Sequence, residues 1–195
     1  MSKFAIGDKG PEMKENNYMS RREALKRLGT AIFGLAAAST GMSSLTSCAE
    51  KKIKRVILYF TGTGNCLYIA RKLAGKDGDV LSIPQLIKKG KYNIEADEIG
   101  IVYPVYGHMP PNMVRRFIEK ANLNANYLFA VLTYGARKCN SVEICSDITR
   151  RYGKNFDYIA TIMMVDNWLP NFDMNEQMKM DKHIPENLEH LQDDI

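Results

Sequence analysis

Residues 56–65, VILYFTGTGN, decide the fold of this chain. The run of apolar residues over 56–60 is typical of a strand with both faces covered, as in a parallel sheet. The glycine-rich loop over 61–65 then leads directly into a segment with Leu67, Ala70 and Leu73 on one helical face. Strand, loop and helix in immediate succession predict the first half of a βαβ unit.

The same alternation continues to the end of the chain. Further strands are predicted over 80–83, 99–103, 127–132 and 158–164. Helices are predicted from 65, after Pro110 and Pro111, over 141–151, and in a final segment with Leu188, Leu191 and Ile195 at helical spacing. Strands alternating with helices predict an α/β fold, a doubly wound five-stranded parallel sheet with strand order 2-1-3-4-5.

In such a sheet, ligands bind beyond the carboxyl ends of the strands, where the strand order reverses. Glycines in the loop over 61–65 let backbone N–H groups approach a phosphate, and the helix N-terminus adds partial positive charge. A Walker loop would need Gly-Lys-Ser/Thr, and a dinucleotide fingerprint would need a third Gly or Ala where this chain has Leu67. The loop therefore predicts a phosphate-binding site, with a tight turn that binds nothing as the alternative.

Residues 59–65, YFTGTGN, resemble the first loop of flavodoxins, especially those of the ferredoxin-fused flavodoxin family. Two further segments, residues 104–106 (PVY) and residues 166–168 (DNW), also resemble this family. The resemblance covers roughly residues 54–170. It implies a flavodoxin-like fold in which the first loop holds the phosphate of FMN and the next two loops flank the isoalloxazine ring.

Loop chemistry and resemblance together assign a set of residues to FMN. Tyr106 and Tyr134 have flat faces suited to stacking on a flavin, and Gly107 and Gly135 beside them give backbone freedom. The alternatives are a rim position for each tyrosine and a plain packing role for Trp168. The full predicted set is Thr61, Gly62, Thr63, Gly64, Asn65, Pro104, Val105, Tyr106, Gly107, Thr133, Tyr134, Gly135, Asn167 and Trp168.

The cysteines and histidines do not form a recognisable catalytic or metal-binding pattern. Cys66 stands at a helix N-terminus, where a thiol pKa tends to fall, so either a redox role or a small packing residue is open. Cys139 and Cys145 are candidates for a disulfide only in an oxidising compartment. His108 lies on the predicted flavin loop as a proton donor or a rim residue. The repeated Cys-x-x-Cys spacing of an iron–sulfur module is missing from the sequence.

The N-terminal segment predicts export. Arg21 and Arg22 form a twin arginine before a weakly apolar run, which is too short and polar to span a bilayer and resembles a twin-arginine signal. Residues 45–48, LTSC, resemble a bacterial lipobox with Cys48 as the lipidated residue. We therefore predict an export signal and lipobox-like segment over 1–48, a short linker over 49–53 and a flavodoxin-like domain over 54–195, with an amphipathic helix as the alternative for the first segment.

Composition and charge fit this interpretation. The net charge is +5, and much of the excess is contributed before Cys48, so no nucleic-acid partner is indicated. We expect an exported FMN-binding flavodoxin-type electron carrier on the periplasmic side of a bacterial membrane, with a separate redox partner protein. The alternatives are a small FMN-dependent quinone or nitro-compound reductase, and a flavodoxin-like binding or structural domain that has lost FMN.

Overall fold

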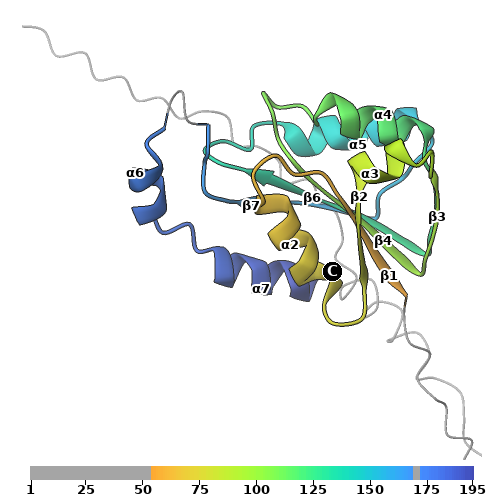
Figure 1. The fold of residues 1–195 in the computed structure, drawn as a ribbon, viewed down its shortest axis with the longest axis horizontal. Helices are drawn as coiled ribbons and strands as arrows, with labels where there is room; N and C mark the ends of the chain where they lie inside the picture. The colour runs from red at the N-terminus through yellow and green to blue at the C-terminus, as the bar shows by residue number, and fades with distance from the viewer. Residues whose placement is uncertain (1–53, 169–171) are drawn as a thin grey trace, which may run out of the picture.

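A computed structural model describes residues 54–168 and 172–195. The predicted export signal and linker lie outside these residues. The described chain forms a five-stranded parallel sheet with the order β2-β1-β4-β6-β7 (Figure 1). Counting only the strands of this sheet, the order is 2-1-3-4-5, so the predicted doubly wound, flavodoxin-like α/β fold is confirmed.

The elements follow one another along the chain with short connections. They are β1 (Arg55–Tyr59), α2 (Asn65–Ala74), β2 (Asp79–Ser82), α3 (Ile83–Lys88), β3 (Asn93–Glu95), β4 (Glu98–Pro104), α4 (Asn112–Lys120), β5 (Asn122–Asn124), β6 (Tyr127–Tyr134), α5 (Ser141–Arg151), β7 (Tyr158–Met163), α6 (Met174–Lys179) and α7 (Ile184–Asp194). None of the helices in the described part of the chain is long and apolar enough to cross a membrane.

Helices cover both faces of the sheet (Figure 1). On one face, α3, α4 and α5 bury an apolar cluster that includes Leu86, Phe117 and Cys145. On the other face, α2 and α7 bury a second cluster that includes Ile69 and Leu188. Because both faces are covered, the central strand β4 is buried along almost its whole length, which explains the continuous apolar run in its sequence.

Two helices and a small second sheet were not predicted. Strands β3 and β5 pair in parallel as a separate two-stranded sheet, and each is only three residues long with polar residues at both ends. The second strand was predicted one residue too far along the chain, since it begins at Asp79 and ends at Ser82, and Ile83 and Pro84 begin α3. Proline suits a first helical turn, where its missing N–H costs no hydrogen bond. The short helix α6 has a largely polar sequence and begins at the capping residue Asp173, whose side chain accepts from the N–H of Asn175.

The topology places three loops side by side at the carboxyl edge of the sheet. Strand β1 is paired with β2 on one side and β4 on the other, so the strand order reverses at the end of β1. Tyr59 is in register with Val102, and Pro104 is in register with Thr133, so β1, β4 and β6 end close to the same level. The loops after these three strands therefore meet.

Candidate functional site

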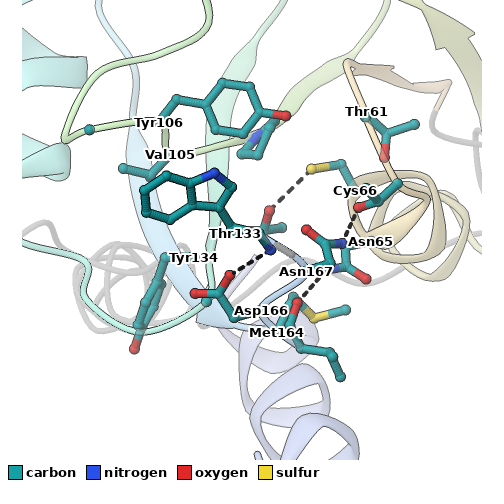
Figure 2. A pocket seen from close by; sticks show the side chains of 17 residues that line it. Thr61, Asn65, Cys66, Val105, Tyr106, Thr133, Tyr134, Met164, Asp166 and Asn167 are labelled. Carbon is teal, nitrogen blue, oxygen red and sulfur yellow. Dashed lines mark hydrogen bonds between the residues drawn. The ribbon is translucent and has the colours of Figure 1, made fainter. Parts of the chain in front are cut away.

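A cavity of about 610 Å³ opens where these loops meet (Figure 2). This volume lies in the range of small-molecule sites. The residues that line it are Thr61, Gly62, Thr63, Asn65, Cys66, Pro104, Val105, Tyr106, Gly107, Thr133, Tyr134, Gly135, Met164, Val165, Asp166, Asn167 and Trp168. All the predicted site residues are among them except Gly64.

The first loop turns into α2 at Gly64, the N-cap residue of the helix. Gly64 has φ 106°, a left-handed conformation that costs little only for glycine. Its N–H donates to Thr61 Oγ1 at 2.8 Å, which fixes the turn. Within the described residues, no side chain caps α2, so N–H groups of its first turn keep the partial positive charge of a helix N-terminus.

The side chains of Thr63 and Asn65 both have hydrogen-bond partners in the segment that follows β7. Asn65 Nδ2 donates to the carbonyl of Val165 at 3.0 Å, and Thr63 Oγ1 accepts a hydrogen bond from Asn167 Nδ2. Both contacts join the first loop to the segment that follows β7. The Asn65 amide thus has a protein partner, whereas the hydroxyl protons of Thr61 and Thr63 can still be donated.

The loop after β4 is a tight two-residue turn. Tyr106 and Met109 exchange both backbone hydrogen bonds, with N···O distances of 2.9 and 3.1 Å. The central residues Gly107 and His108 have φ values of 54° and 71°. Two positive φ angles define a type I′ turn, so Gly107 is required by the backbone, and His108 adopts a conformation that non-glycine residues rarely take.

Aromatic side chains surround the other part of the cavity. Tyr106 is 53 % exposed and Trp168 60 % exposed, and Figure 2 shows Tyr134 away from Thr61 and Asn65. The Tyr106 hydroxyl leans toward the first loop, since a Cβ built on Gly62 would lie 2.9 Å from it. Burial raises the pKa values of Tyr106 and Tyr134, so both rings are neutral at ordinary pH.

Cys66 lines the cavity from the first turn of α2. Its Sγ lies 3.1 Å from Thr133 Oγ1, and the residue is 1 % exposed. Burial raises the pKa of the Cys66 thiol to about 12, although the contact with Thr133 acts in the opposite direction. Desolvation therefore outweighs the tendency of a helix N-terminus to lower a thiol pKa, which favours the small packing residue over the redox role for Cys66.

Sequence reasoning missed four lining residues: Cys66 as a wall residue, Met164, Val165 and Asp166. Asp166 Oδ1 accepts from the backbone N–H of Trp168 at 3.1 Å. Its carboxylate packs against Gly135, which needs no positive φ and is instead fitted to the close approach of Asp166. The motif DNW over residues 166–168 could have identified this wall of the cavity, but the predicted set included only Asn167 and Trp168 and omitted Asp166.

The remaining candidates lie beside the cavity. His108 Nδ1 is 3.1 Å from Asn140 Oδ1, which links the loops after β4 and β6, and His108 does not line the cavity. Cys66, Cys139 and Cys145 are free thiols. Among residues 54–168 and 172–195, no group of His, Cys, Asp and Glu could hold a metal ion.

Comparison with protein-family models finds no match, and comparison with curated proteins finds none. Distant similarity exists to solved structures. A flavodoxin from Streptococcus pneumonia TIGR4 shares 18 % identity over 72 % of this chain and 96 % of its own, with a TM-score of 0.47. The Trp repressor binding protein of Bacillus subtilis shares 10 % identity over 73 % of this chain and 99 % of its own, at 0.47.

A flavoprotein from Lactobacillus acidophilus NCFM, solved in complex with FMN, shares 17 % identity with this chain. The match covers 56 % of this chain and 93 % of the flavoprotein, with a TM-score of 0.44. Similarities of this size carry no argument about function. The fold assignment rests on the chain's own strand order and register.

Proposed function

We propose that this chain binds FMN and carries electrons. One observation supports the proposal most directly. The polar first loop and the aromatic loops after β4, β6 and β7 line a single cavity at the point where the strand order reverses. A phosphate and a flat aromatic ring joined by a short polar chain match that division of the cavity.

The residues present fit FMN. The loop over 61–65 contains no acidic residue, and its hydroxyls and the N–H groups at the start of α2 suit a phosphate dianion. Tyr106, Tyr134 and Trp168 offer aromatic faces for the ring. Because Gly62 has no side chain, the Tyr106 hydroxyl can lie close to it, so the loops after β1 and β4 approach each other closely.

When bound, FMN supplies redox chemistry, since its isoalloxazine ring accepts and returns electrons with protons. The protein contributes binding and orientation. Thr61 and Thr63 would donate hydrogen bonds from their hydroxyls to the phosphate, and Tyr106 and Tyr134 would hold the ring. The buried Cys66 thiol stays protonated against Thr133. The exposed side chains of Tyr106 and Trp168 leave the ring edge accessible for electron exchange with a partner.

The proposal is tested by FMN titration of the purified full chain, followed by quenching of flavin fluorescence. Saturable binding of about one FMN per chain is expected. Thr63→Asp should weaken binding at least about tenfold, because a carboxylate would face the phosphate dianion in a partly dehydrated loop. Thr63→Ser keeps the hydroxyl and is the matched control. A folded wild-type chain that neither contains nor takes up FMN would support the alternative of a domain that has lost the cofactor.

Catalytic turnover of NAD(P)H distinguishes a reductase with this fold from an electron carrier. The FMN-loaded chain is mixed with NAD(P)H and a quinone or nitro-aromatic compound. A carrier gives no sustained oxidation of the nicotinamide without a further protein, whereas a reductase turns over alone.

Export and anchoring form a separate part of the proposal. We propose that Arg21 and Arg22 direct the folded chain through the twin-arginine route and that Cys48 is lipidated, which would place the domain on the periplasmic side of the membrane. Replacing both arginines by lysine should retain the protein inside the cell. Fatty-acid labelling that persists in Cys48→Ala would reject the anchor.

A further inference from the structure

Exposed apolar side chains lie on two loops that line the cavity and at the start of α4. Tyr106, Met109, Met113 and Trp168 are 53 %, 40 %, 42 % and 60 % exposed. Tyr106 and Met109 form the two sides of the type I′ turn, and Tyr106 and Trp168 line the same cavity. Exposed aromatic and methionine side chains around a pocket are typical of protein contact surfaces. We call these four residues the apolar rim.

Positive charge adjoins the apolar rim. Arg137 and Lys138 are exposed on the loop after β6. The hydrogen bond between His108 and Asn140 holds this loop beside the turn that contains Tyr106 and Met109. On α4, Arg116 is exposed three residues after Met113, which places both on one side of the helix.

Few acidic side chains lie on the elements that carry these basic residues, although Asp173, the N-cap residue of α6, and Glu176 in its first turn are exposed beyond Trp168. The first turns of α2 and α4, all of whose residues the structure describes, contain no acidic residue, and that of α5 contains Glu143. Asp166 lies within the cavity wall and accepts from the N–H of Trp168. The N-termini of these helices add further positive potential. By contrast, Asp77, Asp79, Asp97 and Asp157 are placed at or near the amino ends of β2, β4 and β7.

We infer that the apolar rim and its basic neighbours dock an acidic partner protein, one with an apolar contact spot surrounded by carboxylates. Charge complementarity selects this occupant, since opposite potentials steer association and align the two surfaces. Docking here would bring the partner to the mouth of the cavity. The inference rests on the proposed function only for the exchange of electrons, because the docking surface is formed by the chain itself.

The local charge can be measured without flavin. Trp168 is the chain's single tryptophan and stands in the apolar rim, so its fluorescence reports on this surface. Iodide should quench Trp168 more strongly than caesium at about 0.01 M ionic strength, where screening is weak. A local potential of about one kT changes the concentration of a monovalent ion about threefold. The variant Arg137→Glu/Lys138→Glu should reverse this preference.

The control makes the same charge change elsewhere. Lys89 and Lys91 line a different cavity, together with Asp79 and Glu95. The variant Lys89→Glu/Lys91→Glu should keep the iodide preference at Trp168. Equal quenching by both ions in the wild-type chain would overturn the inference.

Docking is then tested with two probes of opposite charge, an acidic two-iron ferredoxin and a lysine-rich cytochrome c. The ferredoxin should quench Trp168 saturably after correction for its own absorption, with an affinity that falls steeply as salt is added. Arg137→Glu/Lys138→Glu should weaken this binding at least about tenfold, and the control variant should bind within about twofold of wild type.

Three outcomes would overturn the inference. The first is saturable binding of the cytochrome in place of the ferredoxin, and the second is an equal loss of ferredoxin affinity in both charge variants. The third is self-association of the chain that buries Trp168, which would make the apolar rim an interface between copies. An FMN titration of the same variants separates the two proposals. Loss of ferredoxin binding with unchanged FMN affinity supports docking, while a chain that docks the ferredoxin but takes up no FMN refutes only the proposed cofactor.

Discussion

The carboxylate of Asp166 fills the space beside Gly135 that a side chain at position 135 would occupy. A Cβ built on Gly135 would lie 2.2 Å from Asp166 Oδ2 and 2.6 Å from Asp166 Cβ. Carbon atoms do not approach so closely, so the two loops after β6 and β7 can come together here only because residue 135 is glycine. This contact sets the shape of one wall of the candidate cavity.

Gly135→Ala should therefore separate the two loops. We expect a loss of about 1–3 kcal/mol in the free energy of unfolding, as for other overpacked sites, measured by urea denaturation. Adding Asp166→Ala should restore little, since the Asp166 Cβ itself is too close. The variant Asp166→Gly lacks the three atoms that lie nearest to this Cβ, so adding Gly135→Ala to Asp166→Gly should cost little further stability. Additive effects in this double-mutant cycle would show that the contact is not formed.

The turn after β4 gives a second prediction. His108 has φ 71° and a hydrogen bond to Asn140. Both His108→Gly and His108→Ala lose that bond, but only glycine adopts the left-handed conformation without a Cβ clash. His108→Gly should be more stable than His108→Ala by about 1 kcal/mol. Equal midpoints in urea for the two variants would show that the turn has another conformation in solution.

The strand order and the position of the cavity followed from sequence because both depend on local patterns. Continuous apolar runs identify strands that are covered on both faces, and parallel strands joined by helices leave few topologies. Once β1, β4 and β6 were identified, the loops at their carboxyl ends had to meet. Tyr106 and Thr61 could thus be placed in one site although they are far apart in sequence.

The missed features depend on tertiary contacts. A helix N-terminus tends to lower a thiol pKa, but burial raises that of Cys66, and burial depends on how α2 packs on the sheet. The Asn65 amide donates to the carbonyl of Val165, which belongs to a segment a hundred residues away and could not be identified from the local pattern. Short elements such as β3 have too few residues for a periodic pattern to identify them.

A buried ion pair at the amino edge of the sheet gives a third prediction. Arg55 Nε donates to Glu98 Oε2 at 2.6 Å, and Arg55 Nη1 donates to the carbonyl of Leu73 at 2.9 Å. The Glu98 side chain is only 3 % exposed. Arg55→Met would leave this carboxylate without its cation, and we expect a loss of about 3 kcal/mol, the low end for buried pairs because Arg55 is 29 % exposed.

The double variant Arg55→Met/Glu98→Gln tests the cause of that loss. It removes the buried charge together with its partner, so it should recover part of the stability that Arg55→Met loses. Urea denaturation of the four chains at neutral pH measures the coupling. If the double variant is as unstable as the sum of the single variants, the pair does not interact in solution.

The buried thiols give the last prediction, which concerns alkaline pH. Burial raises the pKa of Cys66 from 9.0 to about 12 and that of Cys145 from 9.0 to about 11. In the unfolded chain both thiols lose their protons above about pH 9, whereas the folded chain keeps them. The folded state then binds more protons, so stability falls as pH rises from about 9 toward 12. The Cys66 contribution is fully present below pH 9.

Cys66→Ala removes one of these groups, so its stability should fall less steeply with pH than that of the wild type. The difference in slope should approach about 1.4 kcal/mol per pH unit, the value for one proton. Urea denaturation at about pH 8.5, 9.5 and 10.5 measures it, and the shifted tyrosines cancel because both chains contain them. Parallel pH profiles would show that the Cys66 thiol ionises as easily in the folded chain as in the unfolded one, which would place it in contact with water inside the cavity.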